Sequence, residues 1–137
     1  MNSARFWIAL GALSASIAVA AGAIGTHVLK ESLELPESEL ATYDLAVRYQ
    51  MTHSLGLILA GLLMTRCASR LLTFAAAAMV LGIVLFSGGL YGWLFTGQTP
   101  FVHVVPVGGS AWILAWLMLA AGAIWGRWQS GAAPSEA

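Results

Sequence analysis

Three histidines are the side chains of this chain with the widest chemistry, because an imidazole can bind a metal ion, carry a proton or hydrogen-bond across helices. His27 ends a stripe of small residues at helical spacing, and His53 shares a helical face with Tyr49 and Gly56. Small residues let helices approach closely. We therefore expect His27 and His53 to lie on facing surfaces of two neighbouring helices, close enough for direct or water-bridged contact.

Three interpretations of the histidines are compatible with the sequence. They can form a hydrogen-bond network that fixes helix register, line a site for a small molecule, quinone or lipid headgroup, or hold a metal ion. The metal site has the weakest support. No HxxxH or CxxC spacing occurs, and Asp44 is the one carboxylate near enough in sequence to complete a ligand set. We predict no metal and no cofactor.

Arg48 is a cation close to His53 in the sequence, and it lies one helical turn after Asp44. The simplest prediction is an ion pair between the two, because an unpaired guanidinium at a membrane boundary is costly. Alternatively, Arg48 binds a lipid phosphate or an acidic ligand.

The sequence has little to support catalysis or nucleic-acid binding. It contains no nucleophile elbow, no glycine-rich phosphate loop with its lysine, and no HExxH. Six basic and six acidic residues give a net charge of zero, so there is no basic stripe for a phosphate backbone. We expect a protein that is not an enzyme and has no nucleic-acid partner.

Long uncharged runs must position these polar side chains. The chain is 59% hydrophobic and 9% charged, against about 25% charged in a soluble domain. The runs are Phe6 to Leu29, Tyr49 to Thr65 and Leu71 to Gly126. Roughly 20 helical residues cross a 30 Å hydrocarbon core, so the longest run holds two crossings. The sequence predicts an all-α membrane protein, a single domain over residues 1–137 built as a four-transmembrane-helix bundle.

The four helices are expected at about residues 5–28, 37–65, 71–95 and 107–128. Pro36 followed by Glu37 and Glu39 is typical of a helix start. The second helix would be about 40 Å long, so its first turns should extend beyond the membrane on the outer side. Turn residues from Thr96 to Pro100 should end the third helix.

Arginines predict the orientation of the bundle. With four crossings, both termini and the turn after the second helix share one side, which carries Arg5, Arg66, Arg70 and Arg127. Positive charge collects on the cytoplasmic side, so we expect cytoplasmic termini. Cys67 lies in the same turn, where a thiol stays reduced, and we predict only a structural role for it.

Four segments together resemble a known family. They are Gly22–His27, similar to its GAFGAH segment, Ala46–His53, similar to AVRYQMxH, Gly82–Tyr91, similar to GxxLFSGxLY, and Pro106–Gly109, similar to TPxGG. This is the bacterial inner-membrane family catalogued as domain of unknown function 423, which has a small eukaryotic transmembrane relative. The resemblance implies four helices and a multi-pass protein of the bacterial inner (plasma) membrane. It supplies no activity, and Ile24 and Thr26 depart from the family's Phe and Ala.

The same segments indicate where a ligand would bind. Their polar residues, which the predicted topology places in the outer half of the membrane, are His27, Arg48, Tyr49, Gln50, His53, Ser87 and Tyr91. His103 lies outside the matching segments.

These observations favour a non-enzymatic accessory or scaffold subunit of a larger membrane assembly, in contact with membrane lipid and with a membrane-protein partner or a second copy of itself. The alternative is a small-ligand, quinone or metal-ion binding or transport protein that uses an outer-half polar pocket around His27 and His53. A polar pathway across both leaflets would favour transport, and the third and fourth predicted helices contain almost no polar residues in their inner halves.

Overall fold

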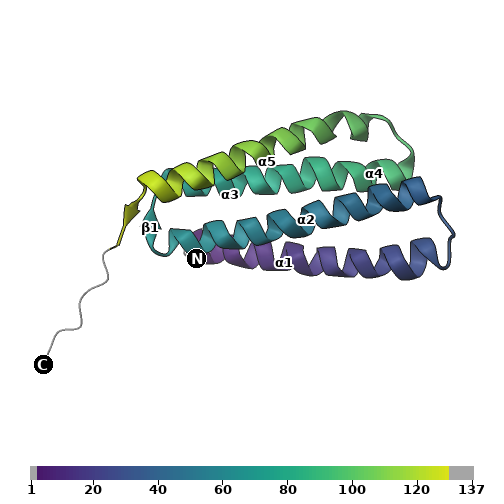
Figure 1. The fold of residues 1–137 in the computed structure, drawn as a ribbon, viewed down its shortest axis with the longest axis horizontal. Coiled ribbons are helices and arrows are strands. Elements are labelled where there is room, and N and C mark those ends of the chain that lie inside the picture. Colours follow the sequence, from purple (N-terminus) through teal and green to yellow (C-terminus); the bar gives the residue numbers. More distant parts are fainter. Residues whose placement is uncertain (1–2, 130–137) are drawn as a thin grey trace, which may run out of the picture.

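The computed structural model describes residues 3–129, which form four long antiparallel helical rods and a short two-stranded ladder (Figure 1). The elements are α1 (Ser3–Ile24), η1 (Gly25–Lys30), α2 (Glu37–Met64), β1 (Cys67–Ala68), α3 (Arg70–Gly82), η2 (Ile83–Ser87), α4 (Gly88–Thr96), α5 (Pro100–Trp125) and β2 (Arg127–Trp128). The segments η1 and η2 are π-helical turns, in which each N–H reaches the carbonyl five residues earlier. The first extends α1, and the second joins α3 to α4 into one rod.

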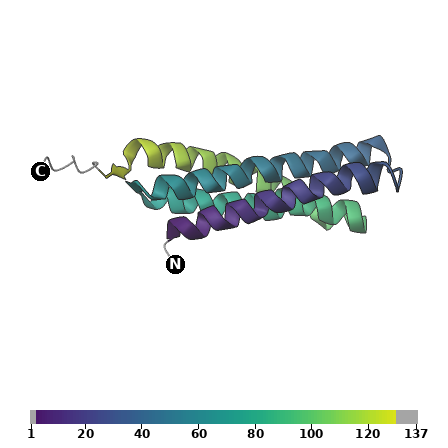
Figure 2. The same cartoon turned by 90° about the horizontal axis from the view of Figure 1, so that it is seen from below.

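The rods pack in chain order, so α1 lies at one edge of the bundle. α1 contacts α2, α2 also contacts α3, η2 and α4, and α5 packs mainly on the rod formed by α3, η2 and α4. Figure 2 shows α1 running beside α2 along its length. We call the end that holds the N-terminus and the β ladder the terminal end, and the end that holds the α1–α2 and α4–α5 links the connection end.

Three of the rods are long and apolar enough to cross a membrane. They are Ser3–Lys30, Arg70–Thr96 and Pro100–Trp125. The helix α2 is equally long but less apolar, because it carries Asp44, Arg48, Gln50 and His53. It lies between α1 and the α3–α4 rod.

Glycines allow α1 and α2 to approach closely. A Cβ atom at Gly11 would lie 2.8 Å from Ser54 O, and one at Gly61 would lie 3.0 Å from Ala4 O. Real Cβ atoms do not come so close to a carbonyl oxygen of a neighbouring helix without displacing it. In lipid, helices are held together by such close contact, because apolar surface gains little by leaving a solvent that is itself apolar.

The helix expected at residues 107–128 begins instead at Pro100 and ends at Trp125, so this prediction is wrong at its start. Proline at the first helical position loses no hydrogen bond, because that N–H has no partner in the helix. Pro106 therefore lies inside the helix rather than before it. The turn before α5 contains Gly97 with a φ of 68°, a left-handed conformation that ends α4.

The β ladder was not expected from the sequence. β1 and β2 pair antiparallel, with Cys67 opposite Trp128 and Ala68 opposite Arg127. Two-residue strands carry no alternating pattern, so nothing in the sequence could indicate them. Cys67 is buried there, and its thiol points at Gly122 O at 3.5 Å, in agreement with a structural role.

The largest apolar cluster lies toward the terminal end, and we call it the terminal core. Its buried members are Leu57, Ala60, Cys67, Leu72, Ala75, Ala76, Met79, Ala115 and Leu119. They come from α2, β1, α3 and α5, so the terminal core holds three rods together.

Candidate functional site

Gln50 joins three helices near the middle of α2. Its Nε2 donates to the backbone oxygen of Ser14 on α1 at 3.1 Å, and its Oε1 accepts the Tyr91 hydroxyl from α4 at 3.1 Å. The side chain is 5% exposed. Both ends of the amide are therefore paired inside the protein.

Ser54 lies one turn further along the same face of α2 and is fully buried. Its Oγ is 2.7 Å from Gln50 O and 2.7 Å from Ser14 Oγ. A hydroxyl has one proton, so Ser54 can donate to only one of these two oxygens at a time. When Ser54 donates to Gln50 O, its oxygen accepts the proton of the Ser14 hydroxyl. The pair links α1 and α2 at one axial level.

Ser87 connects α2 to the π turn η2. It is the last residue of η2, it is 1% exposed, and its hydroxyl donates to Ala46 O at 2.8 Å. A π turn inserts one extra residue and so rotates the residues that follow it about the helix axis. In this rod, Ser87 at the end of the turn and Tyr91 four residues later both face α2.

His53 is buried in an aromatic stack. Its ring lies 3.7 Å from the ring of Trp112 on α5, centroid to centroid, with the planes 6° apart. The Tyr49 ring is nearly parallel to it at 5.8 Å. His53 Nδ1 is 2.7 Å from Tyr49 O, so this nitrogen carries the proton, because a carbonyl can only accept. Trp112 in turn donates its indole N–H to Met79 O at 3.1 Å.

The prediction that His27 and His53 lie together is wrong. His27 is on η1, its side chain is 72% exposed, and its Nδ1 is 3.2 Å from a carboxylate oxygen of Glu31. His53 lies near the level of Ser14, which is 13 residues or about 20 Å along α1 from His27. The small-residue stripe gives a helical face, but it does not give the axial level of a neighbouring helix. His103 is exposed on the first turn of α5.

The predicted ion pair between Asp44 and Arg48 is also absent. Within residues 3–129 the ion pair present is that of His27 with Glu31, and both Asp44 and Arg48 are exposed. Arg48 lies instead in a groove between α1 and α2, beside Val19, Val47 and Met51.

The structure thus brings five of the seven candidate residues together and separates two. Tyr49, Gln50, His53, Ser87 and Tyr91 surround the middle of α2. Arg48 faces the groove, and His27 lies at the connection end. Sequence reasoning missed Ser14, Ser54 and Trp112. Only Ser54 had a signal, its spacing of four residues from Gln50 on one helical face.

The hydrogen-bonded and stacked side chains in the middle of the bundle form what we call the polar layer. Its members are Ser14, Gln50, His53, Ser54, Ser87, Tyr91 and Trp112. In the described part of the chain, no three His, Cys, Asp or Glu side chains are grouped as they would be around a metal ion.

Comparisons with known proteins find one family and several relatives. Residues 21–109 match the family model described as "Protein of unknown function (DUF423)". The UPF0382 membrane protein YwdK of Bacillus subtilis is 36% identical over 121 residues, which cover 88% of this chain and 97% of the relative. The UPF0382 inner membrane protein YgdD of Escherichia coli is 32% identical over 122 residues, covering 89% and 92%. No solved structure matches the chain.

Proposed function

Because the chain belongs to the DUF423 family, whose relatives above are named membrane proteins, we propose that it is a non-enzymatic accessory or scaffold subunit of a larger membrane assembly. The family resemblance of its four motif segments is thereby confirmed. The protein is a multi-pass protein of the bacterial inner membrane, as the name of the Escherichia coli relative and the apolar helices indicate.

The observation that carries the proposal is the internal pairing of the polar layer. Gln50 uses both ends of its amide, Ser54 and Ser87 are bonded to protein oxygens, and His53 uses Nδ1 on its own helix. Paired polar groups in a low dielectric fix one arrangement of helices. A side chain that is already paired with protein must give up that contact before it can bind cargo. Such a layer suits a rigid scaffold better than a passage for a polar solute.

We further propose that α2 is a fourth crossing and that both termini are cytoplasmic. α2 lies between two rods that are long enough to span a membrane, so it should cross the same part of the bilayer as they do. The terminal end carries four arginines on its helix ends and β ladder, Arg5, Arg66, Arg70 and Arg127, and such charges remain on the cytoplasmic side. The first turns of α2 would then extend beyond the outer face.

We propose that the membrane-protein partner packs on α1, the helix at the edge of the bundle. Its exposed apolar residues Leu13, Ile17 and Ile24 are spaced by four and seven, so they form one stripe facing away from α2. α1 packs against a single rod of the protein, whereas α2 packs against two. A helix of a membrane-protein partner can pack on that stripe without disturbing the bundle.

Photo-crosslinking tests this proposal. A photoreactive amino acid at Ile17 should give one protein adduct of fixed mass in native membranes, whereas the same residue at the control position Ile113, which is 65% exposed on α5, should give lipid adducts. The complex should also purify at constant stoichiometry in mild detergent and dissociate on Ile17→Trp. Lipid adducts alone at both positions, with a purified species of monomer size, would contradict a scaffold role.

If the protein instead binds or transports a ligand, a different experimental result is expected. A small molecule should then purify with the chain and be lost on Gln50→Leu while the protein remains folded. Under the scaffold proposal, the same substitution lowers stability, and any cellular phenotype follows the amount of protein in the membrane.

A further inference from the structure

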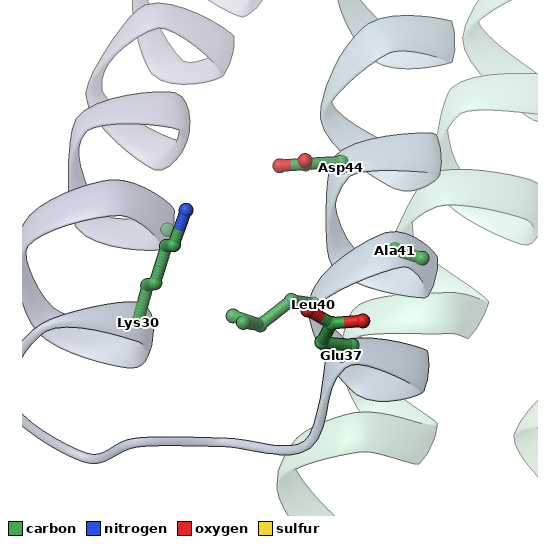
Figure 3. Close-up of a pocket in the computed structure, with 6 residues that line it drawn as sticks. Lys30, Glu37, Leu40, Ala41 and Asp44 are labelled. Carbon is green, nitrogen blue, oxygen red and sulfur yellow. The ribbon is translucent and has the colours of Figure 1, made fainter.

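A groove between α1 and α2 opens at the connection end. Its mouth is a cavity of about 360 Å³ whose polar lining is Lys30 from η1 and Glu37 and Asp44 from α2. Figure 3 shows Lys30 and Asp44 on opposite walls, with the Leu40 side chain extending into the space between them.

The groove continues along the helices toward the middle of the bundle. A second cavity of about 460 Å³ shares Asp44 with the first and is lined by Arg48 and Thr52 together with apolar side chains. Those apolar side chains are Ala18 and Val19 of α1 and Val47 and Met51 of α2. The groove is therefore charged at its mouth and apolar along its floor, and this surface faces away from the polar layer.

The charges in the groove follow a definite order. Asp44 precedes Arg48 by four residues, so its Cα lies about 6 Å nearer to the connection end than the Cα of Arg48. At the mouth, the charges of Lys30 and Glu37 cancel. The groove as a whole is neutral, and of the two remaining charged residues Asp44 lies nearer to the mouth and Arg48 lies deeper.

Arg48 lies inside the hydrocarbon core. Val47 packs near Gly22, because a Cβ atom there would lie 3.7 Å from Val47 Cγ1. The rod Ser3–Lys30 is about 42 Å long, some 12 Å more than a bilayer core. Centring it in the bilayer leaves Arg48 about 8 Å inside the core boundary. A guanidinium at that depth extends toward the headgroups and needs an anion.

We propose that this groove binds one aminophospholipid of the ethanolamine type. The lipid phosphate contacts Arg48, the primary ammonium contacts Asp44, and one acyl chain lies along Val19, Val47 and Met51. The order matches a lipid entering from the connection end, because its ammonium is outermost, its phosphate is deeper and its chains are deepest. The two-carbon linker keeps the lipid charges within about one helical turn of each other.

The groove chemistry also distinguishes among headgroups. A choline headgroup has no N–H to donate to Asp44, so it loses the outer contact and keeps the phosphate contact. A glycerol headgroup has no ammonium to pair with Asp44, and it leaves the lipid with a net negative charge that the neutral groove does not offset. The inference does not depend on the scaffold proposal, because the groove is separate from both the polar layer and the outward stripe of α1.

Lipid titration of the delipidated protein tests the inference. The purified full chain in detergent would receive phosphatidylethanolamine, phosphatidylcholine or phosphatidylglycerol with identical chains, and bound lipid would be counted by native mass spectrometry. We expect at least about tenfold more bound phosphatidylethanolamine than phosphatidylcholine, equivalent to about 1.4 kcal/mol. Equal binding of all three lipids, or a preference for phosphatidylglycerol, would overturn the inference.

Variants then assign each contact. Arg48→Gln should abolish binding of every phospholipid, and Arg48→Lys should restore part of it, because a lysine still presents a positive charge to phosphate. Asp44→Asn should remove the preference for ethanolamine over choline and leave phosphate-dependent binding. The matched controls are Arg66→Gln and Glu39→Gln. Arg66 lies at the terminal end, and Glu39 lines cavities on the α4 side of α2, so neither residue lines the groove. Unchanged binding in Arg48→Gln would refute the site.

Discussion

The terminal core joins three rods and the polar layer joins all four, and the two regions do so by different physics. The terminal core buries leucine, alanine and methionine, whose association in lipid relies on close contact because lipid is as apolar as the side chains. The polar layer buries an amide, hydroxyls and an imidazole that pair with named atoms on neighbouring helices. Close packing is set by the shapes of many side chains together, whereas each hydrogen bond also requires two particular atoms to meet. The comparison teaches that the terminal core holds the helices together, whereas the polar layer determines which residues of neighbouring helices lie at the same height along the bundle.

The largest effect is expected from the terminal core. Leu72 is fully buried in it, so Leu72→Ala should lower the free energy of unfolding by about 2–5 kcal/mol, through lost contacts and a cavity. The matched control is Leu81→Ala, because Leu81 is 49% exposed on the same helix and should cost far less. Unfolding in mixed micelles of detergent and sodium dodecyl sulfate gives both values. Equal losses in the two variants would show that the terminal core is not a packed core.

A glycine at the junction of the two regions should have the next largest effect. A Cβ atom at Gly82 would overlap the Trp112 indole, which stacks on His53 and donates to Met79 O. Gly82→Ala should therefore cost about 1–3 kcal/mol of unfolding free energy. At Gly109, the control, the added methyl would be in ordinary contact with Phe86 at 3.8 Å, and Gly109→Ala should be near neutral. A harmless Gly82→Ala would mean that the indole does not occupy this position.

Gln50→Leu tests the polar layer itself. It leaves the partly buried Tyr91 hydroxyl without its acceptor and removes the contact to α1. Interhelical hydrogen bonds in membranes contribute about 0.6–2 kcal/mol each, so we expect a loss of about 1–2 kcal/mol. Gln98→Leu, in the link before α5, is the exposed control and should change little. A more stable Gln50→Leu protein would indicate that Gln50 is retained for binding rather than for structure.

The smallest effect is expected from His53→Phe. A phenyl ring preserves the stack on Trp112 and loses only the Nδ1 hydrogen bond to Tyr49 O, on the same helix. The free energy of unfolding should fall by less than about 1 kcal/mol. His53→Ala, which also removes the stack, should cost more. If His53→Phe abolished a cellular function at normal protein level, His53 would have a chemical role beyond packing.

The sequence predicts the rods well and the contacts between them poorly. Apolar length and the Pro36 signal locate α2, which begins at Glu37 and runs unbroken to Met64. The family segments contain η2 and the first half of η1. No propensity distinguishes a π turn from an α turn, so it could not be predicted that Ser87 and Tyr91 face α2. The axial position of one helix relative to its neighbour also could not be predicted from the sequence. Helical spacing shows that His27 and His53 are on small-residue faces. Which residue of α1 meets Gln50, however, depends on where η1 ends and α2 begins.

Turn chemistry explains the remaining errors. Pro106 is predicted to mark a helix start, but Pro100 is already at the first position of α5. Pro106 lies inside that helix, where it has no N–H to donate to the backbone. The expected pair of Asp44 with Arg48 follows from spacing alone, whereas the groove beside α1 offers both side chains another direction.

The coupling between Gln50 and Tyr91 tests the central claim most directly, namely that the polar layer is an internally paired structural network. A double-mutant cycle of Gln50→Leu and Tyr91→Phe would be measured by unfolding in mixed micelles, with Gln98→Leu and Tyr91→Phe as the uncoupled reference pair. We predict that the double variant loses less stability than the sum of the two single losses, by about 0.5–2 kcal/mol, because either substitution alone already breaks the bond of 3.1 Å between them. Strictly additive losses would contradict the account, because they would mean that the two side chains do not pair in the membrane.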